Sequence, residues 1–304
     1  MSAIFFDAEL SDERRRQQLY EGALLVYSPT SSSLELCKFA QELAREAFAP
    51  HDPEKAQFVL PVEKYVEILA LLKPKFIHHP RSKELIRGIL NDLGCDLERT
   101  YFDVPRLRTM TDGNYLTAGL AYAFHPHRDT WFSAPPSQLN WWVPVYEVSA
   151  GNTIAFHPRY WSQGVPNSSR EYNYYKWNQE SRREAAKQIK QDTRKQPQAM
   201  APIEMDSHVR LVCKAGGILV FSGAYMHSTV PNGSGRTRFS VDFRTVHIDD
   251  VLARRGALNV DSECTGTTLR DFLRGSDLVR LPQEIAALYD AGPPVDGELI
   301  FSPT

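Results

Sequence analysis

The stretch Leu120–Trp131 reads LAYAFHPHRDTW and places His127 and Asp129 one residue apart. Side chains alternate between the two faces of an extended strand, so a strand here would direct both side chains to one face. An imidazole and a carboxylate on one face can bind the same metal ion, and a second imidazole would complete the two-histidine, one-carboxylate set of non-heme Fe(II) sites. Because chance produces about half a His-x-Asp match in a chain of this size, the interpretation requires a distant histidine partner.

His227 is the best candidate for that partner, 100 residues downstream of His127. Residues 218–221, Ile-Leu-Val-Phe, are all apolar and predict a buried strand that leads toward His227. Residues 231–235, Pro-Asn-Gly-Ser-Gly, predict a tight turn, and residues 236–244 then alternate with period two. The sequence therefore predicts two strands on either side of a turn, with His227 just past the first of them.

The motifs in this order resemble those of Fe(II)/2-oxoglutarate-dependent oxygenases, and in particular the phytanoyl-CoA dioxygenase-like group. His227 opens the segment His-Ser-Thr-Val-Pro-Asn, which matches the group's His-(small)-(Ser/Thr)-x-Pro-Asn pattern. Arg238 follows eleven residues later, and Ser240 comes next on the same strand face. The resemblance covers residues 100–247 or so and is specific for the cofactor chemistry, because several motifs occur in the family's order.

The resemblance assigns a role to each of these residues. It implies that His127, Asp129 and His227 bind Fe(II) as the catalytic metal centre. It also implies that Arg238 binds the remote carboxylate of 2-oxoglutarate through two charge-assisted hydrogen bonds, with Ser240 as a second contact. The implied activity is a dioxygenase reaction that uses 2-oxoglutarate and O2, hydroxylates a small-molecule substrate and releases succinate and CO2.

A further strand is predicted over residues 138–145, Gln-Leu-Asn-Trp-Trp-Val-Pro-Val. Its alternation puts Gln138, Asn140 and Trp142 on one face. The Trp142-x-Pro144 pattern resembles the family strand that lines the cofactor pocket, so we expect Asn140 and Trp142 to contribute to cofactor binding. An aromatic side chain that only packs remains the alternative interpretation of Trp142.

The resemblance also implies the fold, a mainly β chain with flanking helices in which a double-stranded β-helix (a cupin-like jelly-roll) holds the metal near one end. β-Barrels of this length are commonly one domain, so we expect a single oxygenase domain over residues 1–304. Its expected parts are a helical N-terminal part over 1–114, a jelly-roll core over 115–250, and a helical C-terminal extension over 251–304. The core is interrupted by a lid-like insertion at 159–202.

Three amphipathic helices are predicted in the N-terminal part. The first begins at a capping box formed by Ser32 and Glu35, the second is expected to stop at Pro74, and the third runs over residues 82–93. Each has one apolar stripe that must be buried, and the outer face of the sheet is the available surface.

The insertion at 159–202 is interpreted as a substrate lid, since aromatic side chains are an unusual choice for a purely solvated loop. Residues 179–196 are charged and predict a solvated helix over the barrel mouth. An anchor between the insertion and the barrel, or a subunit interface, explains the same aromatic residues equally well. The candidate substrate contacts are Tyr172, Tyr174, Tyr175, Trp177 and Asn178.

Composition limits the classes of protein that remain. Hydrophobic residues at 42% and charged residues at 24% are typical of globular proteins. A net charge of −2 does not indicate nucleic-acid binding. The absence of a long apolar run or signal-peptide pattern leads us to expect no membrane association and a cytoplasmic location. The four cysteines form no Cys-x-x-Cys pair and indicate neither a zinc site nor a disulfide framework. The oligomeric state is not predicted.

Two other classes of function remain open at this point. One is a metal-dependent cupin-type enzyme without 2-oxoglutarate, which Arg238 and Ser240 at the family spacing disfavour. The other is a catalytically silent jelly-roll that binds a ligand, which the complete set of three metal ligands disfavours. Asp129 favours hydroxylation over halogenation, because halogenating relatives have a small residue at that position. Desaturation, epoxidation and cyclisation stay open as outcomes.

Overall fold

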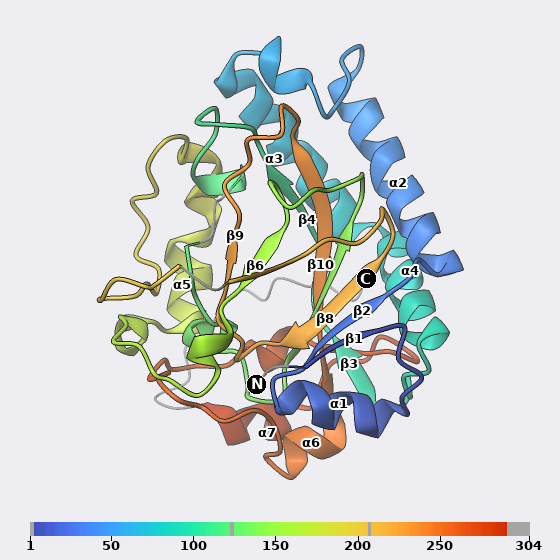
Figure 1. Ribbon diagram of the computed structural model, residues 1–304, viewed down its shortest axis with the longest axis vertical. Coiled ribbons are helices and arrows are strands. Elements are labelled where there is room, and N and C mark those ends of the chain that lie inside the picture. Colours follow the sequence, from blue (N-terminus) through green and yellow to red (C-terminus); the bar gives the residue numbers. More distant parts are fainter. Residues whose placement is uncertain (1–2, 122–124, 206–207, 291–304) are drawn as a thin grey trace.

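A long strand, β10 (Arg238–His247), lies at the centre of an eight-stranded sheet in the computed structural model, which describes residues 3–121, 125–205 and 208–290 (Figure 1). β10 pairs along one edge with β5 and along the other with β4 and then β3. The strand order is β1-β2-β8-β5-β10-β3-β11, and only β1 and β2 pair in parallel. A smaller sheet has the order β7-β6-β9. The other strands are β1 Ile4–Phe6, β2 Leu24–Tyr27, β3 Thr100–Phe102, β4 Arg106–Met110, β5 Leu139–Pro144, β6 Ile154–Phe156, β7 Val209–Leu211, β8 Ile218–Ser222, β9 His227–Thr229 and β11 Leu273–Arg274.

The alternation of side chains along β10 gives the large sheet two different faces. Phe239, Val241 and Phe243 are fully buried and belong to the larger hydrophobic core. Arg238 and Ser240, on the alternate positions, line a cavity on the opposite side of the strand. One strand therefore contributes both to the core and to the candidate site.

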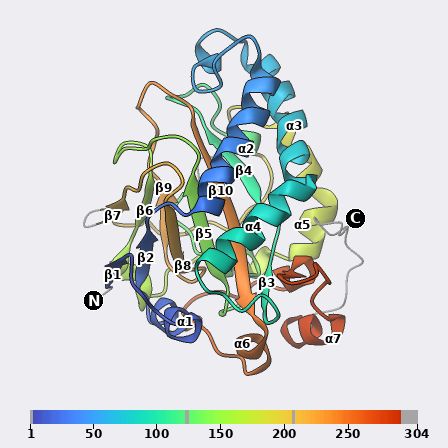
Figure 2. The same cartoon turned by 90° about the vertical axis from the view of Figure 1, so that its right-hand side faces the viewer.

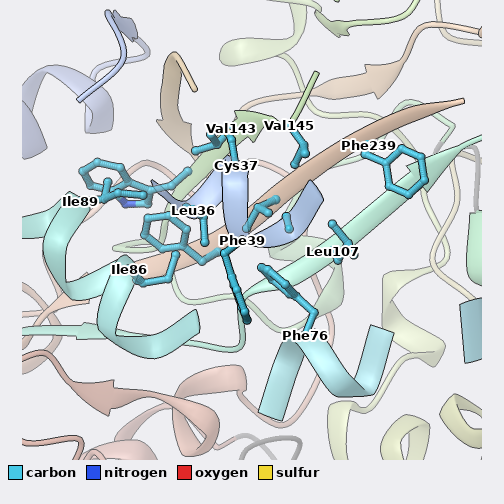
Figure 3. Close-up of a cluster of buried hydrophobic side chains, with 14 of the residues drawn as sticks. Leu36, Cys37, Phe39, Phe76, Ile86, Ile89, Leu107, Val143, Val145 and Phe239 are labelled. Carbon is cyan, nitrogen blue, oxygen red and sulfur yellow. The ribbon is translucent and has the colours of Figure 1, made fainter. Parts of the chain in front are cut away.

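Three long helices cover the apolar face. Figure 2 shows α2, α3 and α4 on one side of the large sheet and β6 and β9 on the other. Leu36, Phe39 and Phe76 of these helices meet Val143 and Phe239 of the sheet in the larger core (Figure 3). The helices are α1 Asp12–Tyr20, α2 Ser31–Phe48, α3 Val62–His78, α4 Pro80–Asp92, α5 Tyr174–Glu180, α6 Ile248–Leu252 and α7 Gln283–Ala286.

A second, smaller core lies between the two sheets. Leu24, Leu219 and Phe221 of the large sheet pack there with Ile154 and Phe156 of the small one. The polar positions of β10 point to the same side, and the cavity lies beside this second core. Part of α3, including Lys73, also lines the cavity. The protein is thus a mixed helix and sheet structure with a large, mostly antiparallel sheet, where the sequence predicted a mainly β chain with flanking helices. None of the described helices has the combination of length and apolar character needed to span a membrane.

The predicted capping box of the first long helix is wrong by two residues. Thr30 is the N-cap of α2: its hydroxyl accepts a hydrogen bond from the Ser33 backbone N–H at 3.2 Å. The Ser33 hydroxyl in turn accepts one from the Thr30 N–H at 2.8 Å. A serine hydroxyl thus does what Glu or Gln does in the usual box, so Ser32 and Glu35 are not needed for the cap.

Pro74 does not end α3, as the sequence predicted; the helix continues to His78. Proline inside a helix costs about 3 kcal/mol through a lost hydrogen bond and a clash with the preceding turn. Leu72 and Phe76 are nevertheless buried on either side of it, and burial of such side chains contributes about 1.5–3 kcal/mol each. Tertiary burial therefore overrides the local signal.

Residues 179–196 do not form the predicted charged helix. α5 ends at Glu180, a short 3-10 helix covers Arg182–Lys187, and no further helix follows in the insertion. The segment has few apolar residues with which to form a buried stripe. Its path is therefore set by individual polar contacts.

Leu36 and Leu34 provide a matched test of the helix-to-sheet core. Leu36 is fully buried and Leu34 is 52% exposed on the same helix. Leu36→Ala should lower the free energy of unfolding by about 2–5 kcal/mol, whereas Leu34→Ala should change it by about 0.5 kcal/mol or less. Urea denaturation followed by circular dichroism measures both values. Similar losses for the two variants would contradict the described packing of α2.

Candidate active site

A pair of backbone hydrogen bonds brings two histidines together from segments far apart in sequence. The His127 N–H donates to the His227 carbonyl at 3.0 Å, and the His227 N–H donates to the His127 carbonyl at 3.0 Å. The predicted strand through Asp129 is not formed: the pairing is an isolated bridge, and Asp129 begins a 3-10 helix over Asp129–Phe132. The Asp129 N–H donates to the Gly223 carbonyl at 2.8 Å, so the chain turns immediately after the bridge.

The three predicted metal ligands meet in spite of this turn. Nε2 of His127 lies 3.5 Å from Oδ1 of Asp129, and Nε2 of His227 lies 3.8 Å from the same oxygen. One ligand atom from each residue lies within 4.8 Å of the others. Atoms bound to one first-row metal ion at about 2 Å each are roughly 3–4 Å apart. The cluster is therefore consistent with an iron site.

Hydrogen bonds fix which ring nitrogen of each histidine is free. Nδ1 of His127 lies 2.8 Å from the His125 carbonyl, and Nδ1 of His227 lies 2.9 Å from the Tyr225 carbonyl. Because a carbonyl oxygen only accepts hydrogen bonds, Nδ1 carries the proton in both rings and Nε2 keeps its lone pair. Burial and the neighbouring His127 also lower the pKa of His227 to about 4, so this ring is neutral near pH 7.

Two amides hold the carboxylate of Asp129. Nδ2 of Asn140 donates to Oδ2 at 3.0 Å, and Nε2 of Gln138 donates to the same oxygen at 3.1 Å. Burial raises the pKa of Asp129, but at the low pH where this carboxylate would titrate the histidines are protonated. A hydrogen bond with His127 and the charges of His227 and Arg244 then outweigh the effect of burial and keep the pKa well below its usual range. The carboxylate therefore presents Oδ1 to the two histidines. Asn140 supports this predicted metal ligand and also lines the cavity in which the sequence predicts cofactor binding.

The predicted cofactor arginine is buried with part of its hydrogen-bonding capacity unused. One terminal nitrogen of Arg238 donates to the carbonyls of Asn152 at 2.9 Å and Thr153 at 3.3 Å, and the guanidinium lies 5.7 Å from the ring centre of Trp142. Nε of Arg238 and the hydroxyl of Ser240 have no hydrogen-bond partner among the described residues. Burial lowers the pKa of Arg238 to about 10, so it stays charged near pH 7.

A single cavity of about 530 Å³ connects these groups. Its walls include the three predicted metal ligands, and Trp142, Arg238 and Ser240 line it as well. Aromatic rings lie directly beside the metal cluster: the ring centre of Phe132 is 5.5 Å from that of His127 and 5.5 Å from that of Tyr172. The volume is within the range of about 300–1,000 Å³ that is typical of small-molecule sites.

The insertion lines the cavity and is also anchored to the C-terminal part. Tyr172, Tyr174, Trp177 and Asn178 are among the lining residues, but Tyr175 is not one of the described residues there. The Tyr175 hydroxyl instead donates to the Asp290 carboxylate and accepts a hydrogen bond from Arg270 at 2.8 Å. The structure therefore places four of the five candidate substrate contacts at the cavity and the fifth in an anchor.

Several residues that line or support the cavity were not assigned from the sequence. The sequence placed Gln138 on the correct face of the strand. Gln138 and Asn140 are polar residues at alternate positions of a buried strand, and this pattern indicated that their side chains have polar partners. Arg244 continues the polar face of β10 and was detectable in the same way. Phe132 and Arg182 gave no comparable signal, because each lies in a short 3-10 helix.

No protein-family model and no curated protein matches this chain. The chain is similar only to proteins of known structure, and this similarity is in the fold. EvdO2 from Micromonospora carbonacea var. aurantiaca is 16% identical, with 80% of this chain and 94% of that chain covered and a TM-score of 0.43. The epimerase SnoN, in complex with Fe3+, alpha ketoglutarate and nogalamycin RO, is 14% identical, with 78% and 85% covered and a TM-score of 0.39. The non-heme monooxygenase ThoJ is 14% identical, with 72% and 71% covered and a TM-score of 0.36. EvdO2 has also been solved with 2-oxoglutarate.

Substitutions at the cluster should separate metal ligands from the residues that hold them. Asp129→Ala and His227→Ala each remove one of three ligands and should abolish measurable Fe(II) binding. Asn140→Leu removes one support of the Asp129 carboxylate and should weaken Fe(II) binding by about 10- to 100-fold. Anaerobic isothermal titration with Fe(II) measures these affinities.

His51→Ala is the control, because His51 is exposed and outside the cluster. It should bind Fe(II) as the wild type does. Wild-type affinity in either ligand variant would reject the assigned cluster, and unchanged affinity in Asn140→Leu would reject the supporting role of that amide.

Proposed function

We propose that this chain is a non-heme Fe(II)/2-oxoglutarate-dependent dioxygenase of the phytanoyl-CoA dioxygenase-like group, with a double-stranded β-helix core, that hydroxylates a small-molecule substrate. One observation carries the proposal. A single cavity contains a cluster of two histidines and a carboxylate together with the buried guanidinium of Arg238. Such a pairing is what an enzyme needs when both a metal ion and an anionic cosubstrate take part in its reaction.

The ligand set fits Fe(II). His127, Asp129 and His227 offer two nitrogens and one oxygen, and a facial set of this kind leaves coordination positions for other molecules. When bound, iron with 2-oxoglutarate supplies the oxidising chemistry, in which O2 is consumed and succinate and CO2 are released. The contribution of the chain is to fix the two Nε2 lone pairs and the Asp129 oxygen in place.

The far end of the cavity fits a carboxylate of 2-oxoglutarate. Nε of Arg238 and the hydroxyl of Ser240, which have no partner in the described part of the chain, are both donors that an incoming carboxylate can satisfy. A buried donor without a partner costs about 1–3 kcal/mol, so binding of an anion there relieves an existing penalty. Trp142 stacks on the guanidinium and limits its orientations.

The insertion supports the exclusion of water from the reaction. Tyr172 packs against Phe132 over the histidine side of the cluster, and the ring centres of Tyr172 and Trp177 are 6.0 Å apart. A closed, water-poor site protects a reactive centre from side reactions. We assign Tyr172, Tyr174, Trp177 and Asn178 to the substrate side of the cavity and Tyr175 to the anchor of the insertion.

The test of this function is an anaerobic titration of the Fe(II)-loaded protein with 2-oxoglutarate, monitored for the weak visible charge-transfer band of the chelate. Succinate formation in air is then measured across a metabolite panel. Fe(II) binding without 2-oxoglutarate binding would favour the cupin-type alternative. Binding of neither would favour a catalytically silent binding protein.

Arg238→Ala should raise the 2-oxoglutarate concentration needed for half-maximal binding by about 30- to 1,000-fold. The physical reason is the loss of a charge-assisted contact in a buried pocket, worth about 2–4 kcal/mol. Fe(II) affinity should change little, because Arg238 contacts none of the three ligands. The same anaerobic titration measures both quantities.

Arg236→Ala is the matched control, since Arg236 is exposed and precedes the first residue of β10. It should bind 2-oxoglutarate as the wild type does. Sensitivity at Arg236 with none at Arg238 would show that the other arginine serves the cosubstrate.

A further inference from the structure

We propose that the cavity contains a second anion site, formed by Arg182, Arg106, Arg244 and Asn178, which binds an oxyanion group carried by the primary substrate. The group is a carboxylate, phosphate or sulfate attached to a small organic body. This inference rests on the proposed function, because it assigns the site to the substrate of that same reaction. The anion site is separate from Arg238, which the proposed function gives to 2-oxoglutarate.

Positive charge exceeds negative charge around the cavity. The side chains of Lys73 and six arginines line it, against the carboxylates of Asp129 and Asp242. Asp103, Asp192 and Asp271 lie behind this wall as partners of lining residues. Six arginines and Lys73, whose pKa burial lowers to about 7, thus face five acidic side chains. A divalent metal ion would balance bound 2-oxoglutarate. The six arginines are Arg106, Arg108, Arg182, Arg194, Arg238 and Arg244.

Three of these arginines, Arg106, Arg182 and Arg244, act on one another at the end of the cavity that lies beside Asp129. Arg106 lies 3.0 Å and Arg244 lies 2.8 Å from the same oxygen of Asp103, so one carboxylate serves two guanidinium groups. Arg244 is opposite Asn140 in the sheet, and Asn140 donates to Asp129. Arg238 lies six residues back along β10, about 20 Å away at 3.3 Å per residue. The two cationic regions are therefore distinct.

Arg182 has no ion pair and no hydrogen bond within the part of the chain that the structure describes, although it lines the cavity. Burial lowers its pKa, as do the charges of Arg106 and Arg244, while Tyr174 and Asp271 oppose this change. A guanidinium held close to two others without a direct acceptor is the arrangement that an incoming oxyanion stabilises.

Asn178 provides an independent sign of a ligand. It is 4% exposed and lines the cavity, yet neither its amide nitrogen nor its amide oxygen has a hydrogen-bond partner among the described residues. Buried side-chain amides are nearly always satisfied. Asn178 precedes Arg182 by four residues in the insertion, so this segment brings a neutral donor and a cation to the same wall.

The experiment uses inorganic phosphate, inorganic sulfate and benzoate as probes. Each is titrated by isothermal calorimetry into the full-length protein with Fe(II) and saturating 2-oxoglutarate under anaerobic conditions, so that Arg238 is occupied. At least one probe should bind, and the preferred probe assigns the class of oxyanion. Arg182→Gln and Asn178→Ala should each weaken that binding by about 10-fold through the loss of one hydrogen-bonded contact.

Lys187→Gln is the matched control, because Lys187 is exposed in the same 3-10 helix as Arg182. It should bind the probe as the wild type does, and circular dichroism and Fe(II) affinity should be unchanged in all three variants. Binding of no probe by the wild type would overturn the anion site. Equal affinity in wild type and Arg182→Gln would overturn it as well.

A second arm separates this inference from the proposed function. The probes are also titrated into Arg238→Ala without 2-oxoglutarate. Probe binding that depends on Arg182 in that background, together with no 2-oxoglutarate binding by the wild type, would overturn the proposed function and keep the anion site. Normal 2-oxoglutarate binding with no probe binding that depends on Arg182 would overturn the anion site alone.

Discussion

The reciprocal backbone hydrogen bonds between His127 and His227 are the interaction on which the candidate site depends. They join a loop that precedes β5 to the start of β9, so two imidazoles that are 100 residues apart in sequence face one another. The Asp129 N–H then bonds to the Gly223 carbonyl and turns the carboxylate toward the same point. Backbone pairing thus fixes the positions of all three predicted ligands, and the side chains complete the geometry.

β10 links this site to the stability of the fold. Its alternate positions place Phe239 and Phe243 in the core under the helices and place Arg238 and Arg244 in the cavity. A slip of one residue in its pairing would exchange the two sets of side chains. The buried aromatic face therefore fixes the register on which the positions of the cavity arginines depend, and the helices packed on that face stabilise the site.

Charged groups inside the protein are tolerated because most of them are paired. Asp242 makes two hydrogen bonds with Arg108, and Asp103 is shared by Arg106 and Arg244. Several polar atoms have no partner within residues 3–121, 125–205 and 208–290 and belong to side chains that line the cavity, among them Nε of Arg238, the hydroxyl of Ser240 and the amide of Asn178. Because unsatisfied buried groups cost free energy, their presence at one cavity is consistent with ligands that supply the missing partners.

The sequence by itself determined the local patterns. The alternation at residues 138–145 and 236–244 predicted β5 and β10, and the spacing of His127, Asp129 and His227 predicted a ligand set that the fold brings together. Only the tertiary structure decided how these patterns are used. Burial of its side chains lets α3 continue past Pro74. His127 forms an isolated bridge with His227 instead of a strand. Asn140 is positioned by its hydrogen bond to Asp129. Each outcome depends on partners that are distant in sequence. Local propensities amount to about 1 kcal/mol per residue or less for most residues, which is too weak to predict such outcomes.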